Sequence, residues 1–189
     1  MQQVLEIVNQ VRKVVVGKDA VIGSILMAML AQGHVLLEDV PGVGKTTMAL
    51  AFSRAMDLSY KRMQFTPDVM PSDITGYTTI QIGGSAGAYV PGAAMCNLFL
   101  ADEINRASSK TQSALLEVME ENSITVDGVT RAVPQPFLVI ATQNPAGSSG
   151  TQPLPESQLD RFMVRLSMGY PDRRSEVEML RRHQNSVSL

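Results

Sequence analysis

The feature that most constrains the fold is the stretch DVPGVGKTT at positions 39–47. It follows an apolar run at 35–37 and precedes a helical pattern of apolar residues over 48–56. A strand, a glycine-rich loop, a lysine, a hydroxyl residue and a helix, in this order, form a cradle for phosphates. The glycines let several backbone N–H groups approach one polyphosphate, and the helix adds the positive end of its dipole. The order therefore predicts an α/β protein that binds nucleotide phosphates.

The residue types in this stretch predict separate roles in binding ATP and Mg²⁺. Lys45 supplies a mobile cation for the β- and γ-phosphates, and the Thr46 hydroxyl completes the coordination shell of the metal. Asp39 stands where the usual pattern has glycine, but aspartate tolerates turn conformations. The alternative interpretation is a chance turn of glycine and proline. The expected phosphate-binding residues are Pro41, Gly42, Val43, Gly44, Lys45, Thr46 and Thr47.

A second apolar run, at 98–101, ends in the two acids Asp102 and Glu103. A buried strand would deliver both carboxylates at its carboxyl end, the edge where ligands bind in open α/β sheets. We expect Asp102 to hold Mg²⁺ through its water shell, and Glu103 to orient or deprotonate the attacking water. Taken alone, the pair is more typical of a cap between a strand and a helix, and the phosphate loop upstream is what favours the functional interpretation.

A third apolar run, at 137–142, precedes Asn144. An amide at that strand end would lie beside the γ-phosphate and could position the lytic water. The alternative is an ordinary turn before Pro145. Residues 60–66 indicate one further strand, and His34 is interpreted as structural because no second metal-type residue lies at ligand spacing.

Two segments predict small hairpins outside the sheet. Residues 78–82 and 88–90 flank a Gly/Ser-rich turn and are typical of a hairpin or, alternatively, of a floppy surface loop. Asp127-Gly128 is a strong hairpin signal. Between 67 and 76, prolines are expected to break regular structure, and Ser109 and Gln112 have the spacing of a capping box.

Composition limits the class of protein. The 189 residues suit one domain, and a net charge of −2 gives no field that favours nucleic acid or an anionic membrane. The single Cys96 excludes an internal disulfide, is expected in the core and fits a reducing compartment. The longest apolar run, 21–31, is too short to span a bilayer, and the N-terminus is not a signal peptide. We therefore expect a cytoplasmic protein.

Residues 36–46, LLEDVPGVGKT, resemble the AAA+ ATPases, and more closely the MoxR family. The resemblance runs in order from about residue 15 to about residue 182. The motifs that continue it are QFTPD at 64–68, PSDITG at 71–76, ADEINRA at 101–107, ATQNP at 141–145 and LPESQLDRF at 154–162.

This resemblance implies a P-loop fold with a five-stranded parallel sheet between helices and small hairpin inserts. It implies that Val15, Val16 and Gly17 lie along adenine and that Asn144 is the first sensor. Arg161 matches the arginine finger, which reaches the γ-phosphate of a neighbouring subunit in a hexameric ring. The α/β core would cover 1–170, and 171–189 would begin a helical lid that ends here inside its first helix.

Three functions are compatible with these features. The first is a Mg²⁺-dependent ATPase that acts as a ring-shaped, chaperone-like motor. The resemblance to MoxR proteins implies that it remodels or matures client proteins, often with a von Willebrand A-domain partner. The second is a nucleotide-controlled assembly switch with little turnover. The third, a DNA-acting helicase, is disfavoured because the net charge is near zero and residues 125–130 carry no lysine or arginine.

Overall fold

A computed structural model describes residues 2–38, 42–79, 87–144 and 154–187. The helices are α1 (Gln2–Val14), α2 (Asp19–Leu30), α3 (Lys45–Ala55), α4 (Pro71–Thr75), α5 (Ser109–Glu121), α6 (Glu156–Leu159) and α7 (Arg173–Val187), with a 3₁₀ turn at Ile104–Arg106. The strands are β1 (His34–Glu38), β2 (Tyr60–Gln64), β3 (Gly76–Thr78), β4 (Tyr89–Pro91), β5 (Leu98–Asp102), β6 (Ser123–Val126), β7 (Val129–Ala132), β8 (Leu138–Gln143) and β9 (Phe162–Leu166).

Five strands form one parallel sheet in the order β2-β5-β8-β1-β9, which confirms the predicted fold class. The inner strands β5, β8 and β1 are almost wholly buried, because parallel sheets are covered on both faces. Their sequences are correspondingly continuous apolar runs, the signal from which the strands were predicted.

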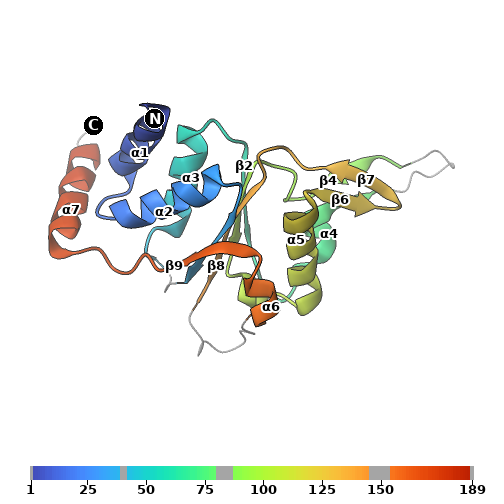
Figure 1. Cartoon of the computed structure of the whole chain (residues 1–189). Coiled ribbons are helices and arrows are strands. Elements are labelled where there is room, and N and C mark those ends of the chain that lie inside the picture. Colours follow the sequence, from blue (N-terminus) through green and yellow to red (C-terminus); the bar gives the residue numbers. More distant parts are fainter. Residues whose placement is uncertain (1, 39–41, 80–86, 145–153, 188–189) are drawn as a thin grey trace.

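Alternate residues of the inner strands β1, β5 and β8 supply two separate cores. On β5, Leu98 and Leu100 pack with α1, α2 and α3, whereas Phe99 and Ala101 pack with α5 on the opposite face. Figure 1 shows these helices on the two sides of the sheet. Cys96 is buried in the second core, as expected, and burial raises the pKa of its thiol to about 11.

The carboxyl ends of the central strands meet at one edge of the sheet. Gln64 at the end of β2 lies opposite Asp102 at the end of β5, and β8 ends at Gln143 beside Glu38 of β1. Gly42 and Gly44, which precede α3, line one cavity together with Gln64 and Asp102. The topology thus brings four polar strand ends to the edge of the sheet at which these glycines lie.

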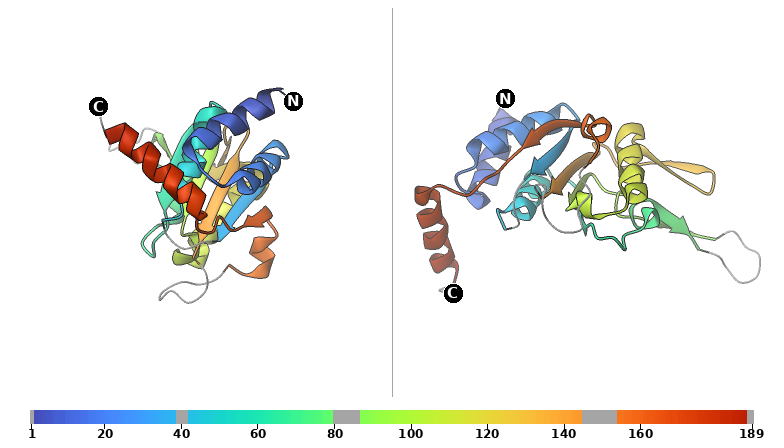
Figure 2. Two further views of the ribbon diagram at one scale, coloured as in Figure 1. Left: turned by 90° about the vertical axis from the view of Figure 1, so that its left-hand side faces the viewer. Right: turned by 90° about the horizontal axis from the view of Figure 1, so that it is seen from below.

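Both predicted hairpins form, and they project from the end of the molecule opposite α7 (Figure 2). Strands β6 and β7 join through Asp127 and Gly128, each with a positive φ, as the hairpin signal requires. The other hairpin starts earlier than predicted, with Thr78 paired to Tyr89, and residues 80–86 lie outside the described part. The Arg131 guanidinium stacks 4.0 Å from the centre of the Tyr89 ring and links the two hairpins.

Two local predictions need correction. The cap of α5 is Ser108, whose hydroxyl accepts from the N–H of Thr111, while the Gln112 amide instead donates to two carbonyls of the preceding turn. A short helix, α4, also forms where only broken structure was expected. Pro71 suits its first position, and the Asp73 carboxylate accepts from the N–H of Met70 at 2.8 Å.

The last helix, α7, begins beside Gly17 and contacts the end of α1. Asp172 caps it by accepting from the N–H of Ser175, and the Arg182 guanidinium donates to the Lys13 carbonyl at 2.7 Å. Figure 2 shows α7 standing at the edge of the three-layer core. No helix in the described ranges has the length and apolarity needed to cross a membrane.

Candidate nucleotide site

The glycine loop has the backbone conformation that its sequence predicts. Gly42 and Gly44 have φ values of +89° and +93°, in the region that favours glycine, and a Cβ at either position would point into open space. α3 begins directly afterwards at Lys45, which is buried. The loop backbone therefore faces a hollow rather than the protein interior. Pro41 lies outside the described residues.

A hollow of about 360 Å³ lies in front of this loop. It joins residues from the glycine loop and the start of α3 to the polar ends of β2 and β5. Its lining residues are Gly42, Gly44, Lys45, Thr46, Thr47, Arg62, Gln64, Asp102 and Glu103. The structure thus brings Lys45, Thr46 and both predicted acids to one cavity, which we call the phosphate hollow.

The carboxylate of Asp102 is fixed from two sides. The Thr142 hydroxyl donates to Oδ1 at 2.7 Å, and the Arg62 guanidinium donates to Oδ2 at 2.6 Å. The Thr142 hydroxyl also accepts from the backbone N–H of Glu103 at 2.8 Å. One buried threonine therefore sets the positions of both acidic residues relative to β8.

Glu103 has a positive φ of 57° and extends beyond the strand end. Its carboxylate accepts from Arg106 at 2.9 Å, from the Asn144 amide at 3.0 Å and from the Gln64 amide at 3.3 Å. The hydrogen bond from Arg106 is the largest cause that lowers the pKa of Glu103, so this carboxylate is ionised at neutral pH. An ionised carboxylate can orient a water or accept its proton.

Asn144 directly follows β8 and lies beside Glu103. Its Nδ2 donates to Glu103, whereas its Oδ1 is buried and has no hydrogen-bond partner among the described residues. A buried acceptor without a partner costs free energy, about 1–3 kcal/mol, unless a ligand or water satisfies it. The Oδ1 of Asn144 is thus an acceptor that a water or ligand could satisfy.

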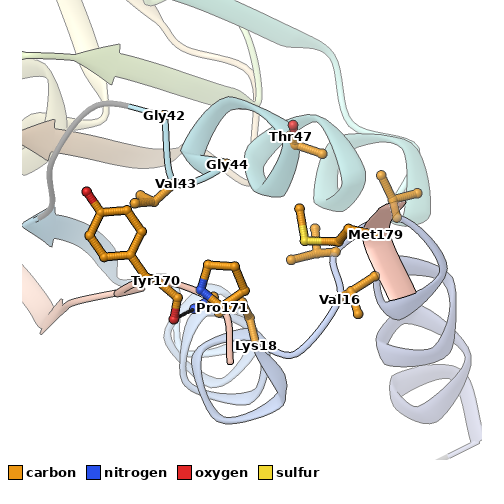
Figure 3. Close-up of a pocket in the computed structure, with 11 residues that line it drawn as sticks. Val16, Lys18, Gly42, Val43, Gly44, Thr47, Tyr170, Pro171 and Met179 are labelled. Atoms are coloured by element: carbon orange, nitrogen blue, oxygen red, sulfur yellow. Dashed lines mark hydrogen bonds between the residues drawn. The ribbon is translucent and has the colours of Figure 1, made fainter. Parts of the chain in front are cut away.

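A second hollow, of about 300 Å³, lies on the other side of the glycine loop. Val15 and Val16 line it, as the adenine prediction requires, together with Val43 of the loop. Figure 3 shows Val16 and Val43 facing Tyr170, Pro171 and Met179, which come from the segment after β9 and from α7. The walls are mainly apolar, which suits a flat base rather than a phosphate. We call this cavity the base hollow.

Gly17 does not line the base hollow but supports its wall. It has a φ of +71°, and a Cβ there would lie 2.0 Å from the hydroxyl oxygen of Ser175. The start of α7 therefore needs glycine at this position. Lys18 stabilises the same junction, because its ammonium donates to the carbonyls of Met168, Gly169 and Tyr170 at 2.6–3.0 Å.

Arg161 does not line the phosphate hollow. It borders a separate cavity of about 390 Å³, together with His34, Glu120 and Ser157. Its guanidinium donates twice to the Glu120 carboxylate, at 2.7 and 3.1 Å, and once to the Ser157 carbonyl. We call this cavity the outer hollow. His34, predicted as structural, is buried there between the N–H of Val139 and the carbonyl of Met119.

Sequence reasoning missed seven residues that line the two hollows, namely Val14, Lys18, Arg62, Gln64, Tyr170, Pro171 and Met179. Arg62 and Gln64 are two residues apart on β2 and therefore share one face of the strand. Two polar residues at this spacing near a strand end are the signal that could have indicated them. Tyr170 and Met179 carry no comparable signal, because a single aromatic residue or methionine after a strand is common.

The two hollows together fit ATP and its magnesium ion. The open glycine loop at the start of an eleven-residue helix suits a polyphosphate. The Thr46 hydroxyl and the Asp102 carboxylate offer the oxygen ligands that Mg²⁺ prefers. Among the described residues no cluster of three His, Cys, Asp or Glu side chains forms a metal site of its own.

Comparisons with known proteins agree with this geometry. Residues 34–164 match the sequence model of the "ATPase family associated with various cellular activities (AAA)". The chain is 52% identical to the uncharacterized protein YeaC of Bacillus subtilis, over 95% of this chain and 56% of the relative. It is 45% identical to the chaperone MoxR1 of Mycobacterium tuberculosis, over 92% of this chain and 46% of the relative.

A crystal structure of a protein from Cytophaga hutchinsonii superposes with a TM-score of 0.86 and 43% identity, over 97% of this chain and 56% of that chain. This chain therefore spans about half the length of the proteins that it matches.

Proposed function

This chain belongs to the ATPase family associated with various cellular activities, with MoxR-type relatives, and from that premise we propose that it binds and hydrolyses ATP with Mg²⁺ as the motor core of a ring-forming, chaperone-like protein. The observation that carries the proposal is the phosphate hollow. There Lys45 and Thr46 of the glycine loop face Asp102 and Glu103 across one cavity.

The proposed reaction transfers the γ-phosphoryl group of ATP to water. The water oxygen bonds to the γ-phosphorus, the bond to the β–γ bridging oxygen breaks, and ADP and phosphate result. Glu103 orients the water and accepts its proton, while Asn144 fixes Glu103 and offers its Oδ1 as an acceptor.

The cations of the hollow stabilise the charge of the phosphates. Lys45 would bind the β- and γ-phosphate oxygens, and Thr46 and Asp102 would hold Mg²⁺. When bound, the metal would neutralise the charge that develops on the phosphate oxygens. On the base side, Val15 and Val16 would pack against adenine.

A ring is proposed because Arg161 lies outside the phosphate hollow of its own chain. A guanidinium on the outer surface can complete the site of a neighbouring subunit, and hydrolysis is then coupled to assembly. Segment 171–189, which contains α7, would begin the lid over the base hollow.

The chaperone-like role rests on the relative named a chaperone, MoxR1. The two linked hairpins project away from the nucleotide site and offer a surface that a client protein could contact. A von Willebrand A-domain partner is proposed on the resemblance alone.

The second candidate function is an assembly switch with little turnover. Three side chains already donate hydrogen bonds to the Glu103 carboxylate, and they would have to rearrange before this carboxylate contacts a water. This arrangement favours slow turnover.

A binding experiment tests the shared part of both functions. Lys45→Ala should weaken binding of fluorescent MANT-ATP with Mg²⁺ at least tenfold, because it removes the cation nearest the β- and γ-phosphates. Lys110→Ala, an exposed lysine on α5, is the matched control and should bind as the wild type does. Equal affinity of wild type and Lys45→Ala would contradict the proposal.

A further inference from the structure

The shortest ion pair of the phosphate hollow is formed by a residue outside the motifs that predicted the site. The Arg62 guanidinium donates to Oδ2 of Asp102 at 2.6 Å. Asp102 is the carboxylate that the proposed function assigns to Mg²⁺. One cation of the protein therefore already contacts the carboxylate that the proposed function assigns to the metal.

The strand register accounts for this contact. β2 is the edge strand beside β5, and Gln64 lies opposite Asp102. Arg62, two residues earlier, is on the same face as Gln64, so its long side chain can run along the strand to the acidic tip. The Gln64 amide oxygen lies 3.5 Å from the guanidinium and marks this path.

The two partners differ in their freedom to move. The Asp102 side chain is only 12% exposed, and the Thr142 hydroxyl holds its other oxygen. The Arg62 side chain is 42% exposed and belongs to an edge strand. When a second cation arrives, the arginine can therefore swing into solvent or toward phosphate oxygens, whereas the carboxylate stays in place.

The Arg62 guanidinium and Mg²⁺ are both cations that can bind the Asp102 carboxylate. A guanidinium and a divalent cation repel each other at one carboxylate, and the burial of Asp102 strengthens that repulsion. We propose that Arg62 competes with Mg²⁺ for Asp102: it neutralises the carboxylate before nucleotide binds and is displaced by the magnesium–nucleotide complex. Arg62 thereby sets the Mg²⁺ concentration at which the site fills. The inference rests on the proposed function and names a positioning residue for it.

The test measures Mg²⁺ dependence rather than activity. MANT-ADP is mixed with protein in EDTA, and Mg²⁺ is titrated until the fluorescence of the bound nucleotide is constant. Arg62→Ala should lower the Mg²⁺ concentration at the midpoint about two- to fivefold, the range expected when one partly exposed charge pair is removed. Arg62→Lys keeps a cation without the planar fork and should lie between the two.

Two controls separate competition from a merely structural pair. Arg54→Ala, an exposed arginine at the end of α3, should leave the midpoint unchanged. In an Asp102→Asn background, Arg62→Ala should no longer shift the midpoint, because the carboxylate that both cations share is gone. Circular dichroism melting of each variant checks that the chain is folded.

The outcomes distinguish this inference from the proposed function. A wild type that binds MANT-ADP with a clear Mg²⁺ midpoint, and an Arg62→Ala variant with the same or a higher midpoint, would overturn the competition alone. A wild type that binds no MANT-ADP at any Mg²⁺ concentration would overturn the proposed function, and the inference with it.

Discussion

The phosphate hollow and the outer hollow are each lined by a glutamate that is paired with an arginine, but the pairs differ in what surrounds them. In the phosphate hollow, the Glu103 side chain is 12% exposed and three side chains donate to it. In the outer hollow, Arg161 and Glu120 are 36% and 58% exposed, and a surface pair of this kind contributes about 0–1 kcal/mol.

The difference indicates which part of the chemistry one chain holds by itself. In the phosphate hollow, hydrogen bonds from other parts of the chain already hold both acidic side chains in place. In the outer hollow, the Arg161 guanidinium is held only by an exposed ion pair and a backbone carbonyl. We interpret Glu120 as the partner that Arg161 leaves when a neighbouring subunit presents a nucleotide.

The largest expected effect comes from the outer hollow. Arg161→Ala should lower the ATP hydrolysis rate about a thousandfold at protein concentrations where subunits assemble, the scale on which arginine fingers act. At high dilution the substitution should change the hydrolysis rate little, because the wild-type subunit then has no neighbouring subunit either. Phosphate release measured over a dilution series checks this, and an equal loss at every concentration would contradict a role between subunits.

Next in size is the loss of the water-orienting carboxylate. Glu103→Gln should lower hydrolysis about 10²–10⁴-fold while MANT-ATP still binds, because the amide cannot accept the proton. Glu117→Gln, on exposed α5 surface, is the matched control. Hydrolysis at the wild-type rate in Glu103→Gln would remove this residue from the mechanism.

Thr142→Val sharpens the claim that the phosphate hollow is fixed from within. The change keeps the shape but removes the hydroxyl that bonds both Asp102 and the N–H of Glu103, and it should lower the free energy of unfolding by about 1–3 kcal/mol. It should also reduce hydrolysis. Thr125→Val, an exposed strand position, is the control in urea unfolding. An equal change in the free energy of unfolding in both variants would mean that the Thr142 hydroxyl stabilises the fold no more than an exposed hydroxyl does.

The smallest effect concerns His34 beneath the outer hollow. Burial lowers the pKa of His34 below its ordinary value of 6.5, and the hydrogen bond to Met119 opposes this only in part. The unfolded chain therefore binds the proton more readily, so the stability that His34 contributes is present above about pH 6.5 and is lost as pH falls through the folded pKa.

Urea midpoints measured at pH 8 and pH 5.5 should show this loss in the wild type. It should be smaller in His34→Gln, which cannot titrate. A variant with the same pH dependence as the wild type would assign the effect to other groups.

Much of the fold can be predicted from local sequence signals. The apolar runs that end at Asp102 and Gln143 are the inner strands β5 and β8, and Asp127-Gly128 forms the turn between β6 and β7. The glycine loop is equally local, because its chemistry lies within a few consecutive residues. These features needed no knowledge of which strands are neighbours.

The missed features depend on contacts between distant parts of the chain. Arg62 reaches Asp102 only because β2 lies beside β5, and Lys18 bonds carbonyls 150 or more residues away. The cap of α5 was displaced by one residue, to Ser108, because adjacent serines give the same local pattern. Gly17 was expected along adenine, but the packing of Ser175 determines its role.

Mixing two inactive variants tests the central claim most directly, because it asks whether one site needs two subunits. Arg161→Ala keeps Glu103, and Glu103→Gln keeps Arg161, so a mixed assembly contains interfaces with both groups intact. At equal concentrations, where the wild-type rate per subunit no longer rises, the mixture should recover about a quarter of the wild-type ATP hydrolysis rate, since random assembly pairs the intact groups at that fraction of interfaces. A mixture that hydrolyses ATP no faster than the mean of its two components would contradict a catalytic site shared between neighbouring subunits.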